Sequence, residues 1–137
     1  MSTLEEGWRE LLGSTNAAAF TALVGNRLYP ARAPENTRRP YAVYSVVSRV
    51  GVYTHDPGPA TDAVKRIQHD FYGDTVAEAI TVAEAFRTSV DGYKGSSGAT
   101  HAVDIQCVTL VPDFTDWDDD AEAYRTTRDA KVWHKES

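Results

Sequence analysis

The chain has 137 residues, of which 42% are hydrophobic and 25% are charged, and it carries a formal net charge of −6. This length suits one domain around one hydrophobic core, and the composition is typical of a folded soluble protein rather than a disordered chain. The acidic balance argues against a protein dedicated to nucleic-acid backbones, because such binding depends on lysine and arginine side chains that displace counterions.

Cysteine content and hydropathy narrow the cellular setting. Cys107 is the only cysteine, so the chain can form no internal disulfide and offers no cysteine-rich zinc site. No apolar run approaches the roughly 18 residues of a membrane span, and the N-terminus lacks the basic and apolar regions of a signal peptide. We therefore expect a single domain over residues 1–137 that is made in a cytoplasm and has no membrane partner.

Two short helices and a loop are predicted at the start of the chain. A capping box at residues 2–6 precedes apolar residues that recur at helical spacing over 4–12. A second helix is predicted over 17–24, where Gly25 provides the stop signal. Residues 27–40 contain three prolines and no apolar period, which indicates an extended surface loop.

The run from Tyr41 to Tyr53 is the most distinct predicted strand, because it is rich in valine and tyrosine. It carries apolar side chains on both faces. That pattern is typical of a strand covered by helices on one face and by a partner on the other, or of a central strand in a larger sheet. After a connector at 54–62 with two prolines and a glycine, residues 64–72 alternate in polarity and predict a second, antiparallel strand.

The main helix is predicted over 76–90. Thr75 and Glu78 form a capping box, apolar residues repeat at three- and four-residue steps, and Gly92 can end the helix. We expect this helix to lie across the sheet. The glycine- and serine-rich residues after it indicate a flexible loop, which lacks the GxxxxGK[ST] pattern of a phosphate-binding loop.

Two further strands are predicted over 103–111 and 124–133, on the basis of alternation that stops at Pro112 in the first of them. The predicted fold class is therefore α+β. It has an antiparallel four-stranded sheet, one main helix packed across it and short N-terminal helices.

The stretch TDWDDDAEAYR, residues 115–125, lies between these last two strands. Asp116, Asp118 and Asp120 have the spacing that begins an EF-hand calcium loop, but Ala121 replaces the required glycine and Thr127 replaces the bidentate glutamate. We interpret the stretch as a solvated hairpin connection and expect no metal and no cofactor.

Few residues have the spacing of a catalytic site. The four histidines lack a second histidine or cysteine at metal-ligand spacing, no GxSxG turn exposes a serine, and Cys107 falls inside an apolar strand. We therefore predict that the protein is not an enzyme. Two alternatives stay open: a small-molecule-binding or enzymatic α+β domain with a concave polar pocket, and a single-strand nucleic-acid binder that stacks bases on its aromatic residues.

Three segments together resemble a known family: RLYPARAPENTRRPYAVYSVVS, KRIQHDFYGDTVAEA and YRTTRDAKVWHKE. They are similar to the tail-completion or tail-terminator proteins of long-tailed bacteriophages, and the resemblance spans nearly the whole chain. The residues that carry it are Arg27, Tyr29, Pro30, Ala33, Pro34, Pro40, Tyr41, Arg66, Gln68, Asp70, Tyr72, Val132 and Trp133.

The resemblance implies a structural role without catalysis. Its members form a homohexameric ring on the head-proximal end of the tail tube, where they stop tube growth and offer a surface to the head connector. The expected partners are other copies of the chain, the tube protein and the connector, while genomic DNA passes through without specific binding. The expected location is the tail–neck junction of a virion assembled in the host cytoplasm. A different neck or head-completion connector protein is the nearest alternative.

Two sets of residues are candidates for contacts in such an assembly. An acidic lumen would favour the passage of DNA by repulsion, so we expect the carboxylates of the acidic stretch to face the channel or a neighbouring subunit. These are Asp116, Asp118, Asp119 and Asp120. Long loops on a rigid sheet commonly carry recognition, which makes the two glycine-containing loops candidates for partner contacts through His55, Asp56, Tyr93 and Lys94.

Overall fold

The computed structural model describes residues 4–34, 37–51, 62–100 and 102–135. Its helical elements are α1 (Leu4–Leu12), the 3₁₀ helix η1 (Thr15–Ala17), α2 (Ala18–Val24) and α3 (Val76–Val90). Its strands are β1 (Leu28–Pro30), β2 (Tyr41–Gly51), β3 (Asp62–Gly73), β4 (Gly95–Ser96), β5 (Asp104–Leu110), β6 (Phe114–Asp118) and β7 (Ala123–Lys135).

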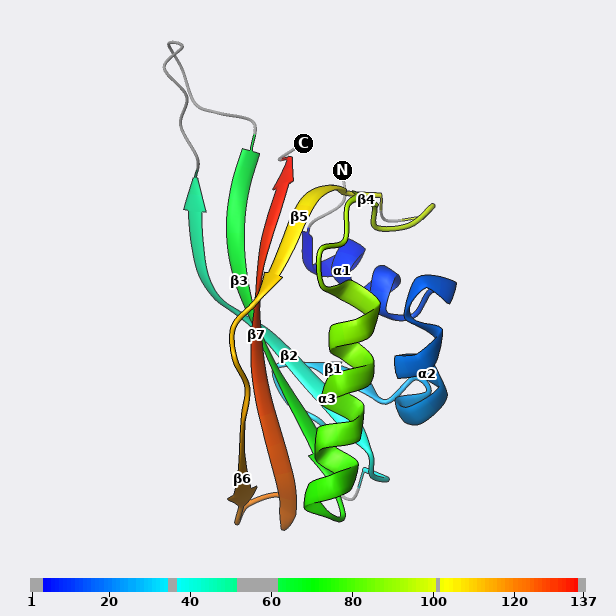
Figure 1. Ribbon diagram of the computed structural model, residues 1–137, viewed down its shortest axis with the longest axis vertical. Coiled ribbons are helices and arrows are strands. Elements are labelled where there is room, and N and C mark those ends of the chain that lie inside the picture. Colours follow the sequence, from blue (N-terminus) through cyan, green and yellow to red (C-terminus); the bar gives the residue numbers. More distant parts are fainter. Residues whose placement is uncertain (1–3, 35–36, 52–61, 101, 136–137) are drawn as a thin grey trace.

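The strands form one seven-stranded sheet in the order β1-β2-β3-β7-β5-β4, with β6 also paired to β7. The β1–β2 pair is parallel and the other pairs are antiparallel, so the sheet is mixed. Strands β5 and β6 follow one another along the same edge of β7: β5 pairs with its C-terminal half and β6 with its N-terminal half. Figure 1 shows the strong twist that results in this long, curled sheet.

The predicted fold class is wrong, because its antiparallel four-stranded sheet is not the sheet observed. The sheet has seven mixed strands rather than four antiparallel ones, and three α-helices pack on it. Strands β1, β4 and β6 have 3, 2 and 5 residues, which is too short for a period-two pattern to stand out. Strand β1 also lies within the proline-rich segment predicted as a loop, and its parallel pairing with β2 depends on tertiary contacts.

The helices cover one face of the sheet, and α3 packs along β3 and β7 (Figure 1). The core between the layers is built around aromatic side chains, with Phe86 of α3 making edge or tilted contacts with Trp8, Phe20 and Phe71 at centroid distances of 5.1–6.3 Å. Each of these four side chains is at most 1% exposed. The helix predicted over 76–90 is confirmed, since its apolar residues bury against this layer.

One histidine belongs to this core. His69 of β3 is fully buried, its Nε2 accepts a hydrogen bond from Trp8 Nε1 at 2.8 Å, and its Nδ1 lies 3.2 Å from the carbonyl oxygen of Arg128. Burial disfavours the charged imidazolium and lowers the pKa of His69 to about 3. The ring is therefore neutral, and the proton on Nδ1 is donated to the carbonyl.

The connection from β3 to α3 is tight. Thr75 Oγ1 accepts a hydrogen bond from the Glu78 amide at 3.0 Å, which is the N-cap half of the predicted capping box, whereas Glu78 Oε1 accepts one from the amide of Asp74 at 2.9 Å rather than from that of Thr75. Gly73 lies directly under the first turn of the helix. A Cβ at this position would lie 2.8 Å from the amide nitrogen of Ala79, so the close approach requires glycine.

Candidate functional site

The sheet face opposite the helices, which we call the open face, is a polar surface. Alternation along β3 turns Ile67, His69 and Phe71 toward the helices and turns Arg66, Gln68, Asp70 and Tyr72 to the open face. The neighbouring positions of β7 on this face are Arg125, Thr127 and Asp129. Several residues that carry the family resemblance therefore share one face of the sheet.

Strand β6 and the start of β7 form a hairpin at one end of this face, which we call the acidic hairpin (residues 114–127). The pairing runs from Phe114 opposite Thr127 to Asp118 opposite Ala123, with a turn at 119–122. The acidic stretch does connect two strands as predicted. Its first half is itself a strand, however, rather than part of a solvated turn.

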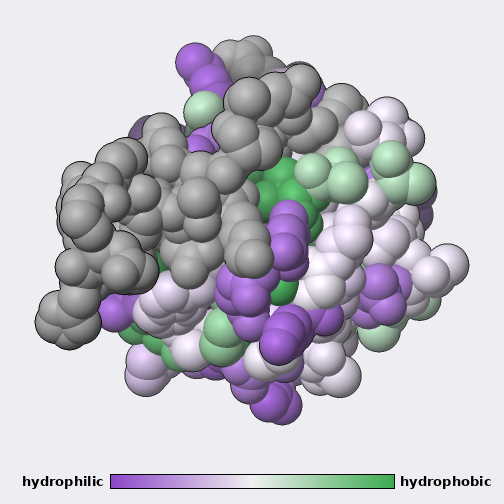
Figure 2. Space-filling model, turned by 90° about the horizontal axis from the view of Figure 1, so that it is seen from above, coloured by the Kyte–Doolittle hydropathy of each residue, from purple (hydrophilic) through white to green (hydrophobic). Residues whose placement is uncertain are grey.

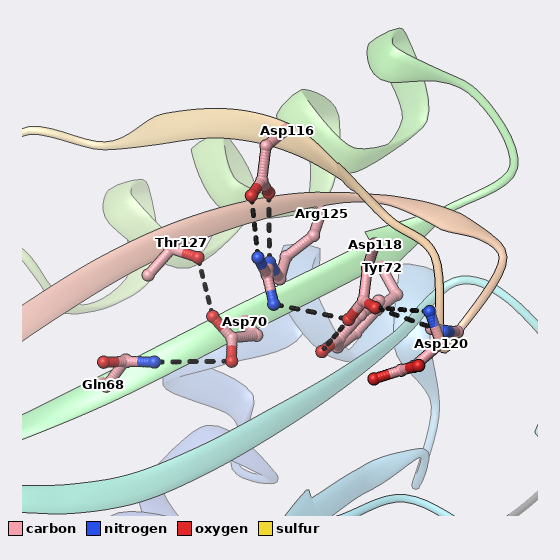
Figure 3. Close-up of polar contacts among 9 residues, drawn as sticks. Gln68, Asp70, Tyr72, Asp116, Asp118, Asp120, Arg125 and Thr127 are labelled. Carbon is pink, nitrogen blue, oxygen red and sulfur yellow. Dashed lines mark hydrogen bonds and ion pairs between the residues drawn. The ribbon is translucent and has the colours of Figure 1, made fainter.

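Arg125 explains how acidic residues can occupy a strand. Its guanidinium binds both carboxylate oxygens of Asp116, with Nε–Oδ1 at 3.0 Å and Nη2–Oδ2 at 2.7 Å, and its Nη1 lies 3.3 Å from Asp118 Oδ2 (Figure 3). The two-point contact matches the planar fork of arginine to a carboxylate. The Tyr72 hydroxyl donates to the same Asp118 oxygen at 3.3 Å.

These contacts shift the pKa values of the groups involved. Hydrogen bonding to Arg125 lowers the pKa of Asp116, and the same bond raises the pKa of Arg125. Burial, followed by the nearby charge of Asp70, raises the pKa of Tyr72 to about 12. At neutral pH the Asp116 carboxylate is therefore ionised and the Arg125 guanidinium charged, while the phenol of Tyr72 on the adjacent β3 stays protonated.

Asp118 and Asp119 also make local contacts within the turn. Asp118 Oδ1 accepts hydrogen bonds from the amides of Asp120 at 3.0 Å and Ala121 at 3.3 Å, which closes the turn. Asp119 Oδ1 accepts a hydrogen bond from Trp117 Nε1 at 2.7 Å. The side chains of Asp119 and Asp120 are exposed at the tip.

The polar contacts continue along the open face. Asp70 accepts hydrogen bonds from Thr127 Oγ1 at 2.7 Å and from Gln68 Nε2 at 3.5 Å (Figure 3). Farther along, Arg66 Nε lies 2.6 Å from Asp129 Oδ2. Opposite charges on adjacent strands thus stabilise the register of β3 and β7.

A small apolar cluster borders this network. Tyr41 and Tyr72 stack with ring centroids 4.7 Å apart, next to buried Val43 and Ala123. Ala33 packs against this cluster, and a half-open pocket of about 530 Å³ lies between residues 31–34 and the hairpin tip. Its lining includes Arg32, Arg39, Tyr41, Tyr72, Asp118 and Asp120.

The chemistry of the open face is that of paired charges. Within the described ranges, no group of three or more histidine, cysteine, aspartate or glutamate side chains is arranged to hold a metal ion. Asp116 and Asp118 are bound by an arginine of their own sheet, and Asp118 also closes a backbone turn. The charged side chains of the acidic hairpin are therefore held by contacts within the sheet itself.

Exposed apolar side chains gather at the edge of this surface. Phe114 is 59% exposed and Trp117 is 49% exposed, and both belong to β6. Trp117 makes an edge contact with Tyr124 on the helix side of the sheet, at a centroid distance of 4.9 Å.

At the opposite end of the molecule, which Figure 2 views from above, the surface that is not grey is mainly hydrophilic or intermediate in hydropathy, with hydrophobic atoms between polar ones.

The other predicted contact residues lie away from the acidic hairpin. Tyr93 and Lys94 precede β4, at the opposite end of the molecule from β6 (Figure 1). Tyr93 packs against the core and donates to the carbonyl oxygen of Ser96 at 2.5 Å, whereas Lys94 is exposed. His55 and Asp56 fall outside the described residues.

Reasoning from the sequence missed Arg125, Asp70 and Thr127 as members of the network around the aspartates. The sequence did carry a signal for part of this network, because residues two apart along β7 share a face of the sheet. This alternation places Arg125, Thr127 and Asp129 on one face. Their partners on β3 and β6 could not be assigned, because the register between strands is a non-local property.

Comparison with known proteins reveals a shared fold. No protein-family model matches the sequence, and no curated protein matches it significantly. A chain of a solved structure described as "Virion of native gene transfer agent (GTA) particle" superposes with a TM-score of 0.66 at 15% sequence identity. The match covers 98% of this chain and 95% of that chain, so the whole fold is shared. In the part of the chain that the structure describes, no helix has both the length and the apolar character to cross a membrane.

Proposed function

We propose that this protein is a structural component of a phage-like virion and that it acts by assembly rather than by catalysis. The observation that carries the proposal is the end-to-end fold match with a chain of a gene transfer agent virion. The open face adds support, since its charged groups form structural pairs and the large exposed aromatics lie together on one edge strand.

Within such a particle, the role that best fits the chain is a homohexameric ring at the head-proximal end of the tail tube. The ring ends tube polymerisation and offers the surface to which the head connector binds. This finer assignment rests on the sequence resemblance to tail-terminator proteins. It is compatible with the fold, because a closed ring requires two different complementary surfaces on each subunit and the sheet has two dissimilar edges.

The acidic hairpin has a place in this proposal. Asp119 and Asp120 are exposed at its tip, where they can line the channel or face a neighbouring subunit. If they line the channel, their charge repels the DNA backbone and reduces adhesion during passage.

Light scattering combined with negative-stain imaging of the purified full chain tests the ring. We expect a species of six subunits with a central opening, in amounts that grow with concentration. A protein that stays monomeric at millimolar concentration, both alone and with the tube protein, would contradict the proposal. A ring that binds the connector but not the tube would instead support the alternative of another neck protein.

A further inference from the structure

Strand β6 is an edge strand with little protection against pairing. It pairs with β7 on one side and with no other strand among the described residues. Edge strands of stable monomers are commonly blocked by lysine, proline or a bulge, because their free N–H and C=O groups can bind another chain. The sequence FTDWD has none of these, and the charges of Asp116 and Asp118 are directed to Arg125 within the subunit.

The opposite edge of the same part of the sheet is β1. Two rows of paired residues cross all five strands at this end and connect β1 to β6. In the order β1, β2, β3, β7 and β6, the first row consists of Leu28, Ala42, Phe71, Thr126 and Thr115. The second row, in the same order, consists of Tyr29, Val43, Asp70, Thr127 and Phe114. Since β1 is parallel to β2 and the three following pairs are antiparallel, β1 and β6 run in opposite directions.

We propose that β6 of one copy packs against β1 of the next copy, so that the sheet continues from subunit to subunit around the ring. The inference rests on the proposed ring and identifies the contact that closes it. The two strands are antiparallel in this arrangement. When the rows are continued across the contact, Phe114 lies beside Tyr29 of the neighbouring copy, and Thr115 lies beside Leu28.

Charge complementarity favours the β1 edge of a second copy as the binding partner of β6. Residues 113–120 contain five aspartates and no basic residue, whereas residues 27–32 contain Arg27 and Arg32 and no acidic residue. The complementarity is one of net charge along the two edges, because Asp116 is already bound by Arg125 and the Arg27 guanidinium already donates to the carbonyl oxygens of Pro40 and Leu23. Pairing of β6 with another β6 would instead bring two acidic strands together, and like charges directly opposite are destabilising.

Side-chain packing, rather than a long ladder of hydrogen bonds, dominates this contact. Pro30 has no N–H, and its carbonyl oxygen already accepts a hydrogen bond from the Arg32 amide at 2.6 Å. The aromatic side chains Phe114 and Tyr29 therefore supply the main contact area. Phe114 is 59% exposed in the single chain, so it gains burial when a neighbour binds.

Single-cysteine cross-linking tests the pairing directly. Tyr29→Cys and Phe114→Cys are made separately and together in a Cys107→Ser background and treated with a short bismaleimide. Side chains opposite one another on antiparallel strands have Cβ atoms about 4.5–5.5 Å apart, which is within its reach. We expect a dimer only when the two single variants are mixed, and a ladder that ends in a closed ring from the double variant.

Each other outcome overturns the inference in a distinguishable way. Cross-linking of Phe114→Cys with itself would show that two β6 strands pair. Oligomers seen by light scattering without cross-links in the mixture would place the contact elsewhere and leave the proposed ring intact. Absence of any oligomer of the unsubstituted chain would contradict both the contact and the ring, whereas loss of oligomers in the cysteine variants alone would agree with the aromatic contact.

A substitution pair provides an independent test. Phe114→Asp should weaken subunit association at least tenfold, whereas Ile80→Asp on α3, which is also an exposed apolar site at 41%, should leave it unchanged. Circular dichroism checks that both variants fold. Equal association of the two variants would overturn the assigned contact.

Discussion

The guanidinium of Arg125 lies between two carboxylates that stand two residues apart on the adjacent strand, and it binds both. Replacement by glutamine, Arg125→Gln, leaves Asp116 and partly buried Asp118 without a cation. We expect the free energy of unfolding to fall by about 1–2 kcal/mol, since hydrogen bonds to charged groups contribute this much at partly exposed sites. Urea denaturation at neutral pH measures the loss.

A matched control is available on the helix. Arg87 pairs with Glu84 at 2.8 Å, and both side chains are more than 40% exposed, so Arg87→Gln should cost markedly less stability than Arg125→Gln. Equal losses for the two variants would mean that the Arg125 contacts contribute no more than an ordinary surface ion pair.

His69 makes folding stability depend on pH in the mildly acidic range. Its pKa falls from 6.5 to about 3 in the folded protein, so between these values the unfolded chain binds a proton that the folded chain does not. Stability is therefore lost as the pH falls below 6.5, with a slope of about 1.4 kcal/mol per pH unit. Carboxylates ordinarily titrate near pH 4, so the range from 4.5 to 6.5 separates histidine titration from theirs, and comparison with a His69 variant separates His69 from the other three histidines.

Urea midpoints of the wild-type protein and of His69→Gln across this range test the assignment. The variant should be less stable at pH 7, because its amide replaces the ring imperfectly in the core, but it should lack the histidine contribution to the slope. A slope that is the same in both proteins would show that His69 does not titrate as the burial of its ring requires.

At the scale of secondary structure, the junction between β3 and α3 depends on the absence of a side chain at residue 73. Gly73→Ala places a Cβ 2.8 Å from the Ala79 amide nitrogen and 3.0 Å from the Glu78 Cβ, so the helix must shift. We expect a loss of about 1–3 kcal/mol, the range found for overpacked sites. Thermal unfolding of Gly73→Ala measures this loss.

Gly13→Ala is the comparison variant. The nearest atom to a Cβ at residue 13 is the end of the flexible Arg9 side chain at 3.3 Å, which can move away. Its melting temperature should therefore stay close to that of the wild-type protein, and a similar drop in both variants would argue against a specific clash under α3.

The elements that could be predicted are those whose pattern is long enough to be read locally. The helix over 76–90 has four turns of apolar spacing, and the strands near 41–53, 64–72, 103–111 and 124–133 correspond to β2, β3, β5 and β7. Strand β6 was missed because its acidic residues resemble a turn unless Arg125 is known to lie beside them. Likewise, β1 is a strand only because β2 is positioned to pair with it.

At the scale of the whole molecule, the sheet is a layer with helices on one face and an ordered polar surface on the other. Its two opposite edges differ in charge, with aspartates along β6 and arginines flanking β1. A subunit of this kind can repeat head to tail, and the direction of repetition determines whether the assembly closes into a ring or extends as a filament. The proposed role in ending tube growth requires closure.

A cryo-electron microscopy reconstruction of the particle that contains this chain tests the central claim most directly. We predict density for six copies in a single ring between the head connector and the tail tube, with β6 of each copy against β1 of the next. Density for the chain at any other position in the particle, or in an open helical array, would contradict the account.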